Sequence, residues 1–248
     1  RGIDSKGATV AIQGFGKVGY WTAIGLENLG LKVVAVSDVH GAVTGFNSVA
    51  ELWKYFTENN SLNMPGTDKL TQEELLHLEV DVLIPAALSD AITEKSAPGI
   101  KAKIVVEGAN APTTPGGDQV LNDNGILTVP DILANSGGVI VSYFEWVKNL
   151  SHIRFGRMQR RQEEARHEMV LREFENLSNA MGDKWSLSPG FKKQYLRGAG
   201  ELELVRSGLD DTMRSSFQSM REIWHERKDV TDLRTAAYLV SIGKVAAS

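Results

Sequence analysis

The chain opens with apolar runs separated by glycine turns. Residues 8–13 form a short, nearly continuous apolar run, which is typical of a strand buried on both faces of a parallel sheet. A glycine turn follows at Gly14–Gly19. Residues 17–29 then carry apolar side chains at near-helical spacing up to Gly30, a favoured residue just past a helix end. A second apolar run, Lys32–Ser37, completes a predicted strand–helix–strand unit.

The same alternation continues to about residue 135. Capping-box patterns at Ser48–Glu51 and Thr71–Glu74 each open an apolar-periodic stretch and predict a helix. Further short apolar runs predict strands at Asp81–Ile84, Lys103–Glu107 and Ile126–Val129. Strands alternating with helices indicate an α/β fold with a doubly wound, mainly parallel sheet of the Rossmann type.

Beyond residue 135 the pattern becomes helical. Spaced apolar residues predict helices over 137–149, 159–181, 209–227 and 231–247, with Gly182 ending the second of them. Residues 182–200 mix glycine, serine, proline and aromatic residues, so an irregular segment is predicted there. The sheet domain is therefore expected to carry a helical C-terminal extension.

Composition and charge narrow the function. The 248 residues include 27 basic and 31 acidic side chains, a net charge of −4, and the pI is near 5.8. This balance argues against nucleic-acid and membrane-surface binding. The absence of cysteine excludes disulfides, thiolate zinc sites and a cysteine nucleophile. The five histidines lack metal-ligand spacing, so we expect no metal site, and no apolar run approaches the roughly 20 residues that span a bilayer.

The start of the sequence has the features of a fragment. It has neither an initiator methionine nor the apolar stretch of a signal peptide, and a strand pattern begins almost at once. We therefore expect an upstream part to be missing. The absence of targeting signals and cysteines predicts a cytoplasmic protein, with the mitochondrial matrix left open.

A dinucleotide-binding pattern follows the first predicted strand. The turn fits G-x-G-x-x-G with the residues Gly14, Phe15, Gly16, Lys17, Val18 and Gly19, and Asp38 ends the next strand. In this context the glycines permit a tight turn and close approach to a pyrophosphate, and the carboxylate accepts hydrogen bonds from the adenosine ribose. A purely structural turn is the alternative. Asp38 favours NAD, because a carboxylate repels the 2′-phosphate of NADP, although Lys17 and His40 offset part of that repulsion.

Two short motifs follow later strands, where open α/β sheets bind ligands. One is Pro85-Ala86-Ala87 and the other is Glu107-Gly108-Ala109-Asn110. Their small residues would let a flat ring approach the backbone, and Asn110 offers both a donor and an acceptor. Ordinary turn chemistry at strand ends is the alternative interpretation.

Longer motifs resemble the glutamate dehydrogenases, within the family of glutamate, leucine, phenylalanine and valine dehydrogenases. In order along the chain they are Gln13–Gly19, Ile84–Ala87, Glu107–Thr114, Pro130-Asp131, Asn135–Val139 and Ser142–Trp146. The resemblance covers essentially the whole chain as the family's C-terminal, cofactor-binding domain. Later segments, such as Lys148–His152 and Leu233–Tyr238, resemble the animal-type enzymes. In those, about residues 157–200 would form an antenna projecting from a hexamer.

The resemblance implies roles for individual residues. Gly14–Gly19 would bind the pyrophosphate and Asp38 the adenosine ribose of NAD, with NADP as the alternative cofactor. Ala86, Ala87 and Asn110 would line the nicotinamide ribose, and Asn135 would reach the nicotinamide and substrate region. Ser142 would bond the side-chain carboxylate of the substrate, which favours glutamate over the apolar substrates of the leucine and phenylalanine enzymes. A helix serine that bonds back to its own turn is the alternative for Ser142.

The implied reaction is the reversible oxidative deamination of L-glutamate to 2-oxoglutarate and ammonia. No catalytic residue is expected in this chain, because the family's catalytic lysine and aspartate lie in an N-terminal substrate domain. The chain alone should bind cofactor without turnover, and the intact enzyme should be a homo-oligomer, a hexamer. A related amino-acid dehydrogenase, or a non-catalytic nucleotide-sensing or assembly module, is the alternative. The expected domains are 1–150 (Rossmann), 151–205 (antenna-like) and 206–248 (closing helices).

Overall fold

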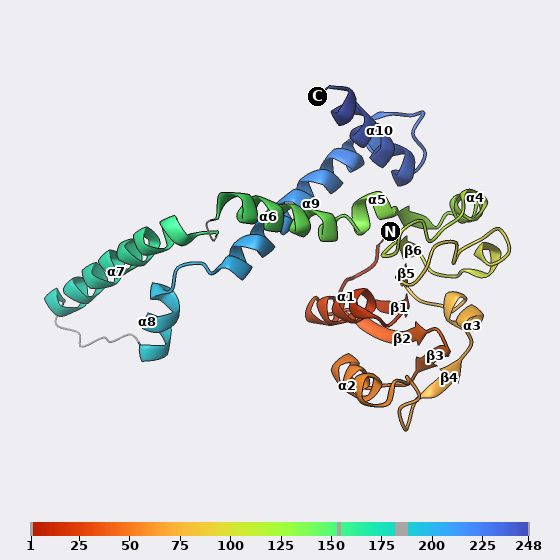
Figure 1. Ribbon diagram of the computed structural model, residues 1–248, viewed down its shortest axis with the longest axis horizontal. Helices are drawn as coiled ribbons and strands as arrows, with labels where there is room; N and C mark the ends of the chain where they lie inside the picture. Colours follow the sequence, from red (N-terminus) through yellow and green to blue (C-terminus); the bar gives the residue numbers. More distant parts are fainter. Residues whose placement is uncertain (1, 153–154, 182–187, 248) are drawn as a thin grey trace. The chain divides into compact units, whose positions relative to one another are not determined.

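A seven-stranded sheet organises the first part of the molecule. The computed structural model describes residues 2–152, 155–181 and 188–247. The strand order is β4-β3-β2-β1-β5-β6-β7, and β1 pairs in parallel with both β2 and β5 (Figure 1). The strands are β1 (Thr9–Gln13), β2 (Lys32–Asp38), β3 (Gly41–Thr44), β4 (Asp68–Leu70), β5 (Val82–Pro85), β6 (Ile104–Val106) and β7 (Leu127–Val129). The predicted fold class is confirmed.

The two strands that lie beyond β2, namely β3 and β4, are absent from the sequence-based prediction. Both are antiparallel to their neighbours, and they have four and three residues. β3 has the sequence GAVT and opens on a glycine, and β4 has the sequence DKL with no buried residue, so neither shows the apolar run that predicts the equally short β5, β6 and β7. They extend the sheet beyond β2, so the turn that follows Asp38 is a hairpin turn rather than the start of a crossover helix.

Helices cover both faces of the sheet, because successive side chains of a strand point to opposite sides. Val10 and Ile12 pack with Ala23 of α1 (Lys17–Asn28) and Leu52 of α2 (Val49–Asn59), whereas Ala11 packs on the opposite face. That opposite face is covered by α3 (Gln72–Leu76), α4 (Pro115–Asp123) and the short 3-10 helix η1 (Ala97–Gly99). The sheet is therefore doubly wound.

Local signals in the sequence set the helix ends. The hydroxyl of Ser48 accepts a hydrogen bond from the amide of Glu51 at the start of α2. At Thr71 both bonds of the predicted capping box are present. Helix α1 ends with a Schellman motif, in which Gly30 (φ +89°) donates to Glu27 O and the next amide donates to Leu26 O.

The C-terminal residues return to the sheet domain. One compact unit comprises Arg1–Ser136 together with Ser216–Ser248, and it holds α5 (Asp131–Ala134), the end of α9 (Glu201–Glu226) and α10 (Leu233–Ala246). Leu133, Met220, Leu233 and Ala236 share a separate buried cluster beside β7. Helix α10 is thereby fixed to the last strand of the sheet.

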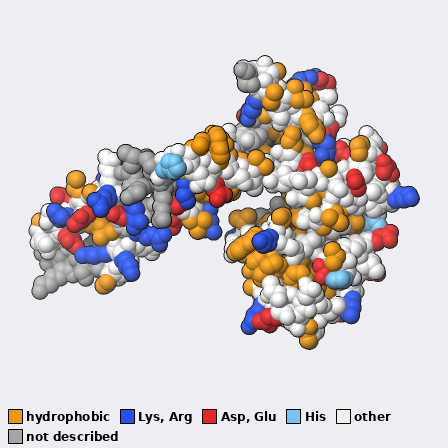
Figure 2. Space-filling model, viewed as in Figure 1, with side chains coloured by type: hydrophobic (Ala, Val, Ile, Leu, Met, Phe, Trp, Pro, Cys, Tyr) orange, Lys and Arg blue, Asp and Glu red, His pale blue; other side chains and the backbone are white. Residues whose placement is uncertain are grey.

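The second unit, Gly137–Ser215, is helical. It holds α6 (Gly137–Ser151), α7 (Arg157–Ala180), α8 (Pro189–Leu196) and the first part of α9. Helices α7 and α8 lie side by side, joined by an ion pair between Glu175 and Lys192 (Figure 1). Figure 2 shows basic and acidic side chains intermixed over α7, a distribution typical of a solvent-exposed helix face.

Two predictions for this unit are wrong. Residues 189–196 form α8 rather than an irregular stretch, because Ser188 caps the helix and Pro189 suits its first turn. Helix α9 begins at Glu201, not at Leu209. Gly208 lies inside α9, where the ring of Phe144 would be 3.3 Å from an added Cβ, so this glycine serves packing rather than a helix end. The predicted stop at Gly182 lies outside the described residues.

Asp81 links the starts of three strands, at the ends opposite the glycine turn. Its carboxylate accepts hydrogen bonds from the amide (2.9 Å) and hydroxyl (3.1 Å) of Thr9, and its other oxygen lies 2.6 Å from Lys103 Nζ. The hydrogen bond from Lys103, and then the amide of Thr9, hold the pKa of Asp81 below its ordinary value.

Asp81→Asn is expected to destabilise the chain by about 1 kcal/mol at pH 7. Because the pKa is lowered on folding, the contribution of the carboxylate is present above the unfolded-state pKa of roughly 4. It is lost as the pH falls through the lower folded-state value. Urea denaturation of wild type and variant from pH 7 to pH 2 measures this. A difference that stays constant over that range would contradict the ion-pair account.

Candidate functional site

The predicted dinucleotide turn lies where the strand order reverses. β1 connects through α1 to β2 on one side, and β5 is its neighbour on the other. The amide of Ala86 donates to Gln13 O (2.7 Å), so the ends of β1 and β5 lie together. In open α/β sheets this reversal leaves a crevice at the carboxyl ends of the strands, where ligands bind.

Two glycines of the turn are required by close packing. Gly14 has φ +100°, and a Cβ there would lie 2.8 Å from Ala86 O. At Gly19 a Cβ would lie 1.8 Å from Gly14 O, so only glycine lets α1 approach β1 this closely. The amide of Gly14 donates to the buried hydroxyl of Ser37 (3.2 Å), which joins the turn to β2.

Gly16 differs from the other two glycines. It is the N-cap of α1 and it is exposed, and apart from its chain neighbours no atom of the residues that the structure describes lies within 4 Å of where its Cβ would be. No acidic residue lies in the first turn of α1, and the exposed Lys17 begins it. The free amides at this helix start and their partial positive charge suit an anion.

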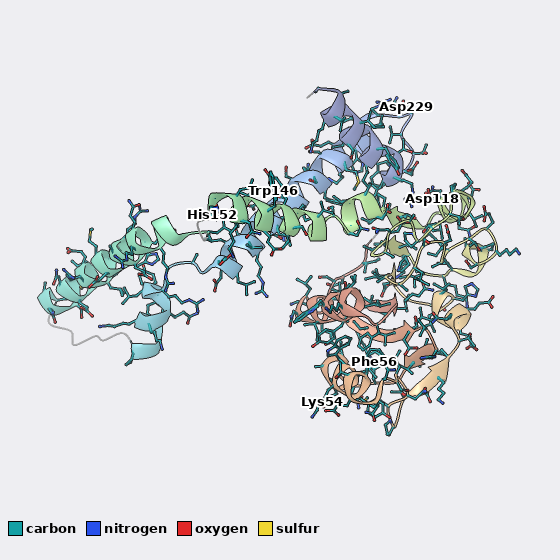
Figure 3. All side chains as sticks on the ribbon, in the orientation of Figure 1. Lys54, Phe56, Asp118, Trp146, His152 and Asp229 are labelled. Atoms are coloured by element: carbon teal, nitrogen blue, oxygen red, sulfur yellow. The ribbon has the colours of Figure 1, made fainter. Side chains whose placement is uncertain are left out.

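The remaining turn residues divide between core and surface. Phe15 is 1% exposed and contacts the rings of Tyr20, Trp53 and Phe56 edge-on, so only its backbone is available to a ligand (Phe56 is labelled in Figure 3). Val18 is 54% exposed. The aromatic cluster holds the turn in place from beneath.

Asp38 ends β2 and is held by the hairpin that follows it. Its Oδ1 accepts the amides of His40 (2.8 Å) and Gly41 (3.2 Å), and its carbonyl oxygen accepts a hydrogen bond from the Gln72 side chain. Asp38, His40 and Lys69 line a cavity of about 150 Å³. One carboxylate oxygen is therefore committed to the turn, and Oδ2 has no hydrogen-bond partner among the described residues.

The strand-end motifs of β5 and β6 lie against each other. The amides of Gly108 and Ala109 donate to Pro85 O (3.0 and 2.9 Å), and a Cβ at Gly108 would lie 3.2 Å from the Cβ of Ala86. Ala86 is half-buried and Ala87 is exposed. The small residues of both motifs thus let the segments after β5 and β6 approach closely, at the same ends of the strands as the glycine turn.

Asn110 and Asn135 are brought together although 25 residues separate them. Asn135 Nδ2 donates to Asn110 Oδ1 (2.6 Å) and lies 3.3 Å from Ala109 O. Asn135 is the C-cap of α5. The pair forms a polar group on the β6 side of the switch point, whereas Asp38 lies on the β2 side.

A buried ion cluster that the sequence analysis does not identify lies beneath this pair. Glu107 is fully buried, and its carboxylate accepts the amide of Asp131 (2.9 Å) and a guanidinium N–H of Arg234 (2.6 Å). Burial acts to lower the pKa of Arg234, but hydrogen bonds to Glu107 and Asp118 outweigh it, so the pKa lies above its ordinary value. Glu107 and Arg234 are 127 positions apart, so no spacing signal in the sequence links them.

Ser142 lies on α6 of the second unit. It is exposed, and its hydroxyl donates to Gly138 O (2.9 Å), one turn earlier in the helix. Within the described ranges no group of three or more histidine or acidic side chains has the arrangement of a metal site. In the same part of the chain no helix is both long and apolar enough to cross a membrane.

Comparison with known proteins decides the family. The family model for Glutamate/Leucine/Phenylalanine/Valine dehydrogenase matches residues 1–185. The chain belongs to this family. The resemblance inferred from its motifs is therefore confirmed.

Three relatives extend the match to nearly the full length of the chain. It is 40% identical to a mitochondrial glutamate dehydrogenase of Dictyostelium discoideum and 41% identical to a glutamate dehydrogenase of Thermotoga maritima, over 98% and 99% of the chain. The crystal structure of a hetero-hexameric glutamate dehydrogenase from Thermus thermophilus, in a Leu-bound form, matches with a TM-score of 0.70 and 29% identity over 96% of the chain.

The chain spans about half the length of the relatives it matches: 48% and 49% of the two curated proteins, and 45% of the Thermus thermophilus chain. The family model ends at residue 185, before α10. The relatives, in contrast, align over nearly all of the chain, so the part that holds Arg234 is shared with glutamate dehydrogenases beyond the reach of the family model.

Proposed function

We propose that this chain is the cofactor-binding part of an NAD(P)-dependent glutamate dehydrogenase. The reaction of the whole enzyme would be oxidation of L-glutamate with water to 2-oxoglutarate and ammonia, with reduction of the nicotinamide nucleotide. The observation that carries the proposal is Gly16, a glycine at the start of α1 that no contact with the described residues requires. Relatives named as glutamate dehydrogenases support the same reaction.

The described residues fit a dinucleotide. An added Cβ would fill the space that Gly16 leaves open above the first amides of α1, which would donate to the diphosphate. Asp38 Oδ2 would accept from the adenosine ribose. Because Asp38 marks the adenosine side, the nicotinamide half would lie on the β5–β6 side, over Ala86, Ala87, Asn110 and Asn135.

When bound, the nicotinamide ring supplies the hydride acceptor. The chain's own residues bind and orient: the glycine turn fixes the diphosphate, Asp38 fixes the ribose, and Asn110 and Asn135 fix the nicotinamide half. We assign no catalytic residue to this chain, and proton transfer is left to the family's separate substrate domain. The boundaries 1–150, 151–205 and 206–248 remain our proposed domain division.

We propose Ser142 as the residue that recognises the substrate side-chain carboxylate. Its single hydroxyl proton is donated to Gly138 O, so it would have to rotate to donate to a carboxylate instead. An aliphatic residue would leave a buried carboxylate unsatisfied, which favours glutamate over leucine or phenylalanine.

We further propose that the intact enzyme is a homo-oligomer, a hexamer, and that it is cytoplasmic. The Thermus thermophilus relative is described as hetero-hexameric, which supports a six-subunit assembly. The Dictyostelium discoideum relative is named as mitochondrial, so the matrix is the alternative compartment.

Calorimetric titration of the chain tests the proposed cofactor. We expect NAD to bind about tenfold more tightly than NADP, because Asp38 accepts from the ribose and repels a 2′-phosphate. Asp38→Asn keeps a side-chain oxygen for the His40 and Gly41 amides but removes the charge. The variant should bind NAD more weakly and narrow the preference to about threefold or less.

Asp123→Asn is the matched control, since it removes an exposed carboxylate at the end of α4. It should leave both affinities unchanged. Failure of the wild-type chain to bind any nicotinamide nucleotide would refute the proposed function. Equal affinity for NAD and NADP would refute only the preference.

A further inference from the structure

The buried ion cluster joins α10 to the loop that follows β6 and to the helices α4 and α5. Arg234 lies on α10, and one guanidinium nitrogen contacts both Glu107 Oε1 (2.6 Å) and Asp118 Oδ1 (3.1 Å). Its other terminal nitrogen lies 3.7 Å from Asp131 Oδ1. One cation therefore holds three carboxylates from three different segments (Asp118 is labelled in Figure 3).

The carboxylates in turn hold the backbone on both sides of Asn110. Glu107 Oε2 accepts the amide of Asp131, and Asp131 Oδ2 accepts the amide of Ala111 (2.8 Å). Ala111 has φ +44°, a conformation that a residue with a Cβ rarely adopts without support. The cluster thus fixes the loop that follows β6 and the start of α5 at the same time.

Fixing these two segments also fixes the Asn110–Asn135 pair. Asn110 lies between Glu107 and Ala111 on the loop, and Asn135 caps the end of α5, four residues after Asp131. The bond from Asn135 Nδ2 makes Asn110 Oδ1 an acceptor. Asn110 Nδ2 then remains as a donor with no partner among the described residues.

We propose that Arg234 is a positioning residue for the nicotinamide half of the nucleotide site. It would act through Glu107 and Asp131, and its effect would be confined to the β6 side, since Asp38 and the glycine turn lie on the β1–β2 side. The inference rests on the proposed function, because it requires a nicotinamide nucleotide at this edge of the sheet. It assigns α10 a role in ligand geometry besides packing.

Arg234→Lys tests this role without removing the charge. A lysine ammonium is a single point charge and does not reproduce the planar fork that contacts Glu107, Asp118 and Asp131 together. ADP-ribose probes the adenosine and diphosphate contacts alone, whereas NADH adds the nicotinamide and reports its surroundings by fluorescence. We expect NADH affinity to fall about fivefold with a smaller fluorescence change, and ADP-ribose affinity to change less than twofold.

Two further variants separate positioning from stability. Asp118→Asn removes the charge of one partner of Arg234 on α4 and leaves Glu107 in place, so it should produce a smaller effect in the same direction. Arg227→Lys alters an exposed ion pair with Asp229 in the same unit. It should leave the affinities for NADH and ADP-ribose unchanged. Thermal denaturation of each variant establishes that it is folded before titration.

The outcomes are distinct. A selective loss of NADH in Arg234→Lys and Asp118→Asn supports the proposal. Parallel losses of NADH and ADP-ribose, or no change in a folded variant, overturn it and leave the proposed function standing. A wild-type chain that binds neither ligand overturns the proposed function and this inference with it.

Discussion

Arg234→Met is expected to lower the free energy of unfolding by about 3–5 kcal/mol at neutral pH. Methionine keeps much of the volume of the aliphatic part of the arginine side chain but lacks the guanidinium. Glu107, which is fully buried, would lose the donor to its Oε1, and Asp118 and Asp131 would lose their shared cation. Removing one partner of a buried pair costs far more than the pair contributes, because an uncompensated charge remains. Urea denaturation followed by circular dichroism measures the change.

Two variants control this result. Arg227→Met breaks an exposed pair with Asp229 and should leave the free energy of unfolding almost unchanged, because solvent screens that pair. Adding Glu107→Gln to Arg234→Met removes the stranded charge, so the double variant should recover part of the loss. A stability for Arg234→Met within about 1 kcal/mol of wild type would show that the cluster is not a buried ion network in solution.

Local patterns in the sequence were sufficient to predict the parallel part of the fold. Each of the five parallel strands is a short apolar run beside a turn or cap signal, and residues such as Gly30 and Thr71 act on their immediate neighbours. The glycine turn is predictable for the same reason, since strand, turn and helix are contiguous. In contrast, β3 and β4 are similar in length to β5, β6 and β7, but β3 opens on a glycine and β4 contains two charged residues, so neither is an apolar run.

The buried support of the site was not predictable from local pattern. In the sequence, Glu107 belongs to a strand-end motif and Arg234 to a predicted helix. Their pairing depends on the packing of α10 beside β7. The same holds for the Gln72 side chain on the Asp38 carbonyl. Long-range polar contacts of this kind arise from tertiary structure and leave no period in the sequence.

Gly16→Ala is expected to weaken dinucleotide binding at least about tenfold, or ~1.4 kcal/mol, with little effect on the fold. The backbone at Gly16 (φ −81°, ψ −162°) suits alanine, and its Cβ would meet no atom within 4 Å. The change in stability should stay within about 1 kcal/mol, most of it from the N-cap position. Substitution at Gly14 or Gly19 would not be as informative, because a Cβ there collides with the chain itself.

Gly25→Ala is the matched control. Gly25 is exposed in the middle of α1, with no atom within 4 Å of its Cβ position. Alanine should stabilise the helix there by about 0.5–1 kcal/mol and leave ligand affinity unchanged. The pair of variants therefore makes the same chemical change on one helix, once at its N-terminus and once in its interior.

Titration of the wild-type chain, Gly16→Ala and Gly25→Ala with ADP-ribose is the most direct measurement of whether the first amides of α1 hold a diphosphate. The predicted result is tight binding by wild type and Gly25→Ala, and at least tenfold weaker binding by a folded Gly16→Ala. Equal binding by all three would show that the diphosphate does not lie against Gly16, and would contradict the assignment of this turn as the nucleotide site.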